Sequence, residues 1–157
     1  MGRGWIGRVW GRTGCNSNGQ CVTGDCGGIQ CGTRSGQTPA TLAEIAFDQY
    51  AGLDWYDVSN VDGFNLPISF RPTSGFKYSS NNKYDCKTAD CPKNINSVCP
   101  ADAAVKSGGT TVGCRNNNPP FFKQNCPNAY SYDYDDQTST FTCAQNPETN
   151  YEIVFCP

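Results

Sequence analysis

Apolar and polar positions alternate along several short runs of this chain. The runs at residues 138–143 and 151–156 alternate with the period of two that is typical of half-buried strands. Residues 5–9, followed by Trp10, form a short apolar and aromatic run that also predicts a strand. These short runs predict an all-β fold. No repeat of solenoid or propeller length accompanies them.

Two central segments lack a simple alternation of apolar and polar residues. Residues 53–70 hold two apolar runs around the turn dipeptide Asp62-Gly63, which predicts a pair of strands. In residues 41–50 the apolar positions fit both the helical and the strand period, so periodicity leaves helix and strand open there.

The segments between these runs are rich in residues that favour turns. Glycine and cysteine dominate residues 11–36, which predicts a compact cross-linked loop region. Residues 76–120 are expected to form a loop subregion pinned by disulfides, because a free loop of that length is unusual in a compact domain. The length of 157 residues suits one domain spanning 1–157.

The chain contains 11 cysteines and no histidine. Structural zinc sites use Cys-x-x-Cys pairs or histidine partners, and neither occurs here, so the cysteines are expected to form disulfides in an oxidising compartment. We therefore expect no metal and no cofactor, and a secreted protein, either extracellular (in the apoplast) or vacuolar. The first residues lack the apolar stretch of a secretory signal, so we expect a processed or lost amino terminus.

The charge balance narrows the possible partners. Twelve basic residues against 14 acidic ones disfavour binding to nucleic acid or to anionic membranes. No apolar run approaches the length of a transmembrane segment. The lack of histidine removes the usual serine–histidine and cysteine–histidine nucleophile systems, so any catalysis would depend on carboxylates.

The run Gly19-Gln-Cys-Val-Thr-Gly-Asp-Cys-Gly-Gly-Ile-Gln-Cys31 resembles the signature of thaumatin-like proteins, a family of plant defence proteins that includes osmotin. Further matches follow in the family's order, among them Trp10-Gly-Arg-Thr-Gly-Cys15, Val61-Asp-Gly-Phe-Asn65, Phe121-Phe-Lys-Gln-Asn-Cys-Pro127, Asp135-Asp-Gln-Thr-Ser-Thr-Phe-Thr-Cys143 and Val154-Phe-Cys-Pro157. The resemblance implies a disulfide-rich β-sandwich core with cross-linked loop subdomains packed against it. It also implies that the family's amino-terminal strands are missing here.

The resemblance further implies a disulfide pattern. The expected bridges are Cys15–Cys21, Cys26–Cys31, Cys86–Cys143, Cys91–Cys126 and Cys99–Cys114. Cys156 is then expected to remain unpaired, because its partner would lie in the missing strands.

Antifungal members of the family line a cleft with one arginine and four carboxylates, which the resemblance maps onto Arg8, Glu44, Asp57, Asp62 and Asp135. Taken singly, each has a simpler explanation. Asp62 fits a turn, Asp135 lies in a solvated acidic stretch, Glu44 fits the polar face of a strand, and Arg8 and Asp57 could form a structural ion pair. Trp55, Tyr56 and Phe64 lie nearby in sequence and are candidates for contact with sugar rings. Tyr130, Tyr132 and Tyr134 are expected to pack along a strand.

The function expected from the set as a whole is antifungal defence by a monomer that binds fungal β-1,3-glucan in the acidic cleft. One alternative is a weak endo-β-1,3-glucanase with Glu44 as the acid and Asp57 or Asp62 as its partner. The other is a proteinaceous inhibitor of microbial glycoside hydrolases, which the acidic, histidine-free composition disfavours. Binding without catalysis is the reading we prefer.

Overall fold

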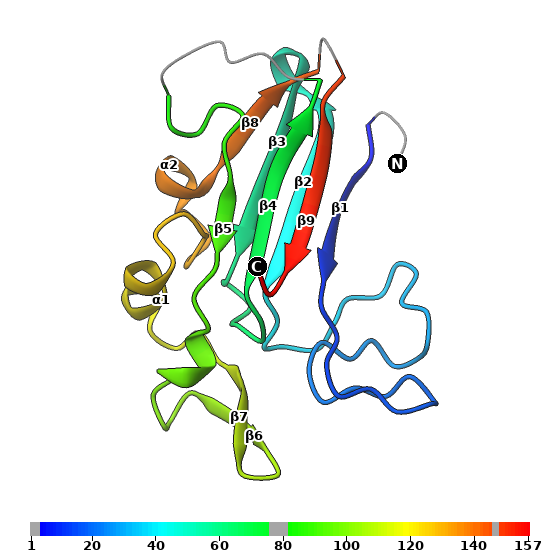
Figure 1. Ribbon diagram of the computed structural model, residues 1–157, viewed down its shortest axis with the longest axis vertical. Coiled ribbons are helices and arrows are strands. Elements are labelled where there is room, and N and C mark those ends of the chain that lie inside the picture. Colours follow the sequence, from blue (N-terminus) through cyan, green and yellow to red (C-terminus); the bar gives the residue numbers. More distant parts are fainter. Residues whose placement is uncertain (1–3, 76–81, 146–147) are drawn as a thin grey trace.

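The computed structural model describes residues 4–75, 82–145 and 148–157 and consists mainly of two stacked antiparallel sheets (Figure 1). The first sheet has the order β1-β2-β3-β8 and the second the order β5-β4-β9. The predicted all-β, disulfide-rich sandwich is confirmed.

The first sheet contains the strand whose type the sequence left open. Its members are β1 (Ile6–Trp10), β2 (Leu42–Gln49), β3 (Leu53–Ser59) and β8 (Phe141–Ala144), and the short 3-10 turn η1 (Tyr50–Gly52) joins β2 to β3. In β2 the side chains of Ala43 and Ile45 enter the core, where they are almost fully buried, while Glu44 and Ala46 lie on the opposite face. Burial of one face of the strand decides the 41–50 segment in favour of β structure.

The second sheet consists of β4 (Ile68–Ser74), β5 (Ala89–Cys91) and β9 (Asn150–Phe155). The two predicted strands of residues 53–70 therefore exist as β3 and β4, but they lie in different sheets and the second begins later than its apolar run. The turn at Asp62-Gly63 carries the chain between the layers. Gly63 has φ +91°, and a Cβ there would lie 2.6 Å from the Cys114 carbonyl oxygen, so this close approach requires glycine.

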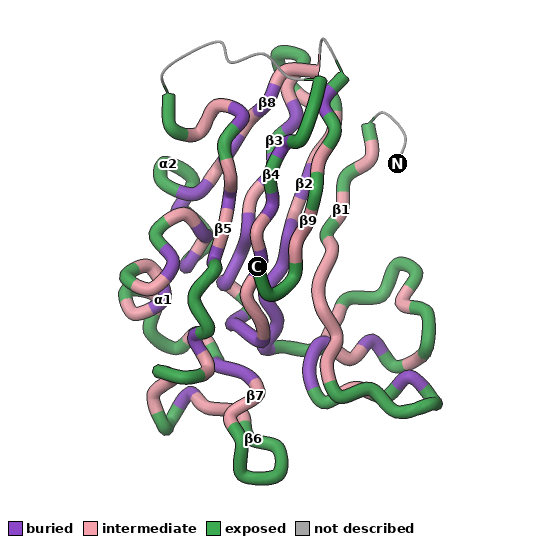
Figure 2. Tube along the Cα trace, in the orientation of Figure 1, coloured by how far each residue is buried: buried purple, intermediate pink, exposed green. Residues whose placement is uncertain are grey.

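The core between the sheets contains a cluster of aromatic rings among aliphatic side chains. Tyr56 is 1% exposed, and its ring centroid lies 5.2 Å from Phe70, 5.8 Å from Phe141 and 5.3 Å from Tyr151. These separations are typical of favourable tilted and edge-to-face ring pairs. Figure 2 shows the buried positions concentrated along β2, β3, β4 and β5, with exposed residues in the surrounding loops.

Two groups of loops and short elements extend from the same end of the sandwich (Figure 1). Residues 11–41 form one, beneath β1. The other contains η2 (Ile95–Ser97), the hairpin of β6 (Ala104–Ser107) and β7 (Thr110–Cys114), and helix α1 (Pro119–Asn125). The expected 76–120 loop subregion thus includes short regular elements, and its residues 76–81 lie outside the described residues.

The interpretation of the tyrosine stripe was wrong. Tyr130, Tyr132 and Tyr134 lie in a loop before the short helix α2 (Asp136–Ser139), and Tyr134 is 86% exposed. The predicted strand at 138–143 likewise begins only at Phe141, because Asp136–Ser139 is helical.

Five disulfides join Cys15 to Cys21, Cys26 to Cys31, Cys86 to Cys143, Cys91 to Cys126 and Cys99 to Cys114, and these are the pairs that the resemblance implies. The first two lie within the 11–41 loops. Cys86–Cys143 joins the segment before β5 to β8, and Cys91–Cys126 joins β5 to the end of α1. Cys156 is a free, exposed thiol.

Candidate functional site

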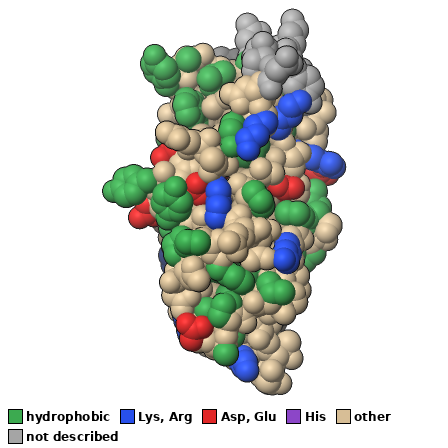
Figure 3. All heavy atoms as spheres, turned by 90° about the vertical axis from the view of Figure 1, so that its left-hand side faces the viewer, with side chains coloured by type: hydrophobic (Ala, Val, Ile, Leu, Met, Phe, Trp, Pro, Cys, Tyr) green, Lys and Arg blue, Asp and Glu red, His purple; other side chains and the backbone are tan. Residues whose placement is uncertain are grey.

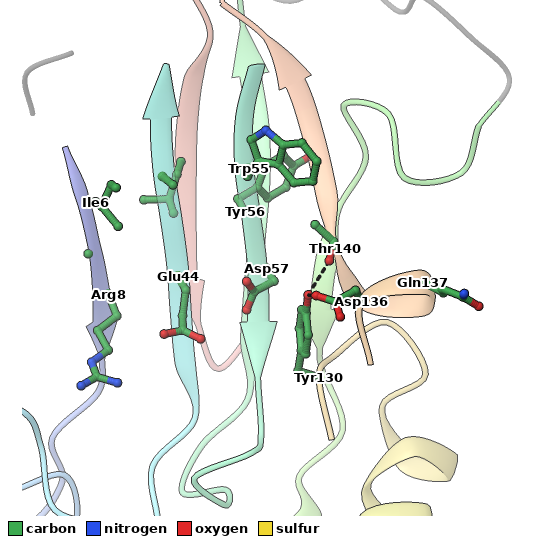
Figure 4. A pocket seen from close by; sticks show the side chains of 13 residues that line it. Ile6, Arg8, Glu44, Trp55, Tyr56, Asp57, Tyr130, Asp136, Gln137 and Thr140 are labelled. Atoms are coloured by element: carbon green, nitrogen blue, oxygen red, sulfur yellow. Dashed lines mark hydrogen bonds between the residues drawn. The ribbon is translucent and has the colours of Figure 1, made fainter. Parts of the chain in front are cut away.

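Three charged residues form a row across the outer face of the first sheet. Arg8 on β1 is directly opposite Glu44 on β2, and Glu44 is directly opposite Asp57 on β3. Side chains alternate between the two faces of a strand, so these three point away from the core that their sequence neighbours fill. Figure 4 shows them side by side on adjacent strands.

Two hollows of about 620 and 450 Å³ meet at this row. Both are lined by the same five residues, Arg8, Glu44, Asp57, Tyr130 and Asp136. Because the hollows share these residues, they form one continuous cleft, called here the acidic cleft. The larger hollow extends toward Trp55, and the smaller one extends toward Asp62 and Asp133.

The carboxyl groups of the row favour the protonated form more than exposed carboxyls do. Burial raises the pKa of Glu44; the charge of Arg8 lowers it and that of Asp62 raises it. Burial raises the pKa of Asp57 well above its usual range, and the charges of Glu44 and Asp136 raise it further. Oδ1 of Asp57 is also buried and accepts no hydrogen bond from the described residues.

These raised pKa values have a consequence for stability. The folded state holds the Asp57 proton more tightly than the unfolded chain does. The resulting stabilisation is fully present below the ordinary Asp pKa and is lost as the pH rises through the raised value. Ionising Asp57 in the folded protein therefore costs folding free energy.

Arg8 is positioned by the neighbouring loops. Its guanidinium Nη2 donates a hydrogen bond of 2.6 Å to Ser35 Oγ. The ion pairs among the described residues are Arg12–Asp25, Arg71–Glu152 and Lys123–Asp135, so the suggested Arg8–Asp57 ion pair is not formed. In the sheet Glu44 lies between the two residues.

The structure places Asp135 outside the cleft lining. Its side chain is 3% exposed, and Oδ2 accepts hydrogen bonds from Lys123 Nζ at 2.8 Å and from the Ser131 amide at 3.1 Å. Burial would raise the pKa of Asp135, but the hydrogen bonds from Lys123, Thr138 and Ser131 and the Lys123 charge together lower it. Asp135 therefore organises the loop that forms one wall of the cleft.

Asp136 and Tyr130 line the cleft on that wall instead. The Tyr130 hydroxyl donates to Asp136 Oδ1 at 2.8 Å and also bonds the Thr140 hydroxyl (Figure 4). Neither Tyr130 nor Asp136 was among the cleft residues expected from the sequence. The adjacent acidic residues 135 and 136 indicated that an aspartate lines this part of the cleft, but the sequence alone does not show which of the two is buried.

The remaining candidates divide between the cleft and the core. Asp62 is exposed and lines the smaller hollow beside the Gly63 turn. Trp55 is 37% exposed and lines the larger hollow, whereas Tyr56 and Phe64 are 1% and 0% exposed and belong to the core. Tyr56 also borders the larger hollow, but its side chain is buried, so of the three aromatic candidates Trp55 is the exposed one that lines the cleft.

Metal-ligand clusters and membrane-spanning helices are two other features that could mark a functional region. No group of three or more histidine, cysteine, aspartate or glutamate side chains in the described part of the chain is arranged to hold a metal ion. Nor does that part contain a helix long and apolar enough to cross a membrane. Figure 3 shows basic and acidic side chains scattered over the face that bears α1 and α2.

Comparison with known proteins gives one consistent result. The thaumatin family model matches residues 1–119 and 116–157. The chain is 42% identical to "Pathogenesis-related protein 5" of Arabidopsis thaliana over 98% of this chain and 72% of the relative. It is 46% identical to "Pathogenesis-related thaumatin-like protein 3.2" of Cryptomeria japonica, over 96% and 70%. It is 40% identical to "Glucan endo-1,3-beta-glucosidase" of Prunus avium, over 98% and 72%. The chain therefore belongs to the thaumatin family.

Proposed function

We propose that this protein is a plant defence protein that binds β-1,3-glucan of fungal walls in the acidic cleft. The observation that carries the proposal is the register Arg8–Glu44–Asp57, which places a row of polar groups on one rigid sheet face beside the exposed ring of Trp55. Two relatives carry the words "pathogenesis-related" in their names and a third is named "Glucan endo-1,3-beta-glucosidase", which favours this partner.

The cleft suits a neutral ligand rich in hydroxyl groups. Carboxylates accept hydrogen bonds from hydroxyls, and a protonated carboxyl also donates one. The raised pKa values of Glu44 and Asp57 favour the protonated form, in which a carboxyl group both donates and accepts. A sugar hydroxyl needs both kinds of partner when it leaves water.

Secretion is part of the same proposal. Five disulfides are stable in an oxidising environment and are rare in the cytosol. The apoplast or the vacuole, where a plant meets fungal walls or stores defence proteins, fits that chemistry.

The binding claim is tested by retention on insoluble β-1,3-glucan at neutral pH. Asp57→Asn combined with Asp62→Asn replaces an acceptor oxygen by a donor at both positions, so retention is expected to weaken by about tenfold or more. The control is Asp48→Asn with Asp102→Asn, which removes the same charge at two exposed residues outside the cleft.

The Asp57→Asn and Asp62→Asn variant is expected to fold as well as the wild type. Asp57→Asn removes a buried carboxyl that is costly to charge, so this variant is expected to unfold at a denaturant concentration no lower than the wild type. Retention of the cleft variant equal to that of the control would contradict glucan binding at this site.

A second candidate function, weak endo-β-1,3-glucanase activity, is favoured by one observation. Glu44 and Asp57 are direct cross-strand neighbours, a placement that brings two carboxyls close together. The raised pKa of Glu44 suits a general acid. The raised pKa of Asp57 opposes the ionised form that a nucleophile or a general base requires, so binding remains the preferred function.

Hydrolysis is separated from binding by Glu44→Gln. If the cleft is catalytic, wild-type protein releases reducing ends from soluble β-1,3-glucan, and Glu44→Gln abolishes the release while retention on insoluble glucan persists. We expect no release above background from either protein. Release that Glu44→Gln removes would establish the enzyme.

A further inference from the structure

A second row of side chains lies beside the charged row on the same face of the first sheet. Ile6 on β1 is opposite Ala46 on β2, and Ala46 is opposite Trp55 on β3. All three line the larger hollow of the acidic cleft. This set, Ile6, Ala46 and Trp55, is called here the apolar row.

The two rows are parallel and adjacent. Each member of the apolar row lies two residues along its strand from a member of the charged row, as in Ile6 and Arg8 or Trp55 and Asp57. Two residues of strand span about 6.6 Å, which is comparable to the width of one pyranose ring. Figure 4 shows Ile6 and Trp55 displaced along the strands from Arg8 and Asp57.

The apolar row remains accessible although its chemistry favours burial. Ile6 is 66% exposed and Trp55 is 37% exposed, while the next residue, Tyr56, fills the core. A flat indole bordered by aliphatic side chains in a hollow gives contact area to the apolar face of a ligand. The charged row beside it gives that ligand its hydrogen bonds.

We propose that the apolar row is a stacking subsite for a second glucosyl residue, next to the residue held by the charged row. The inference rests on the proposed glucan binding and makes it more specific. The ligand is a β-linked glucan segment of at least two consecutive residues that runs along the strands. Its equatorial hydroxyls leave flat C–H faces, one of which lies on the Trp55 indole.

The test uses linear β-1,3-gluco-oligosaccharides of two to six units and the full chain. Trp55→Ala is expected to weaken binding of the longer oligosaccharides by about tenfold, because the ring contact is lost. Trp55→Phe is expected to keep most of the affinity, since it retains an aromatic face. Tyr50→Ala is the matched control: Tyr50 is 85% exposed and lies outside the cleft, so its removal should leave binding unchanged.

A second readout follows the indole itself. The chain has three tryptophans, so the indole N–H resonance of Trp55 is identified by its loss in Trp55→Phe. Titration of the wild type with hexasaccharide is expected to shift that resonance more than those of Trp5 and Trp10.

The outcomes separate the two proposals. If the wild type binds β-1,3-glucan but the Trp55 resonance does not move and Trp55→Ala binds as the wild type does, the stacking subsite is overturned and cleft binding stands. If the wild type binds no β-1,3-glucan, the proposed function fails and the subsite fails with it.

Discussion

Replacing Cys86 and Cys143 together by serine is expected to lower the free energy of unfolding by about 4 kcal/mol. The two cysteines are 57 residues apart, and in the chain-entropy model a cross-link over that separation removes this much conformational freedom from the unfolded chain. Both positions are also almost fully buried, so the serine hydroxyls add a desolvation cost. Denaturant unfolding under non-reducing conditions measures the loss.

The matched control is the double serine variant of Cys15 and Cys21. These cysteines are only six residues apart, so the same model gives a loss of about 2 kcal/mol. Cys15 is exposed and Cys21 is half-buried, which keeps the desolvation cost small. Equal losses for the two pairs would contradict the entropic account of the long bridge.

Lys123→Met is the second substitution from which a large effect is expected. Lys123 Nζ donates to Asp135 Oδ2 at 2.8 Å, to Ser139 Oγ at 2.8 Å and to the Ala129 carbonyl at 3.2 Å. Methionine keeps the apolar stem but leaves Asp135, which is 3% exposed, as a buried charge without its cation. The expected loss in unfolding free energy is about 3 kcal/mol.

This loss should depend on pH. Because the folded-state pKa of Asp135 is lowered, its stabilisation is present above the ordinary Asp pKa and is lost as the pH falls through the lowered value. The gap between wild type and Lys123→Met should therefore narrow in acid. Adding Asp135→Asn to Lys123→Met should restore part of the stability at neutral pH, and a double variant no more stable than Lys123→Met would argue against an unpaired charge as the cause.

Glucan retention provides a further readout for Lys123. The loop that Asp135 organises carries Tyr130 and Asp136 on the wall of the cleft. We expect insoluble glucan to retain less of the Lys123→Met variant than of the wild type, even under conditions where both proteins are fully folded.

The strands were predictable where one face of the strand is buried, because burial imposes the period of two. Residues 151–156 show that pattern and form β9 apart from the last residue. Residues 41–50 did not settle the choice, since the apolar positions Ala43, Ile45 and Phe47 become decisive only when β4 and β9 cover them. The turn between β3 and β4 packs at Gly63 against Cys114, which is far away in the sequence, and no local pattern shows that the two strands belong to different sheets.

The candidate site was predictable where its side chains lie on regular strands. The placement of Arg8, Glu44 and Asp57 in one row follows from strand alternation and register. The wall of the cleft is a loop, and no periodicity distinguishes Asp135 from Asp136 or assigns Tyr130 to the cleft. That distinction depends on Lys123 of helix α1. Its Nζ donates a hydrogen bond to Asp135, which is buried, while Asp136 bonds Tyr130 in the cleft.

The floor and the wall of the cleft differ in how they can change. Three hydrogen-bonded strands fix the relative positions of Arg8, Glu44, Asp57 and Trp55, so a ligand meets a floor that needs little ordering on binding. The wall is a loop that is attached at two points: the backbone of Tyr130 is hydrogen-bonded to Val58 and Asn60, and Lys123 binds the buried Asp135. Substitutions in the 129–140 segment that spare these two attachments can therefore change the width of the cleft while its floor stays constant. For the glucan binding that we propose, this is a route to a different choice of polysaccharide without rebuilding the sheet.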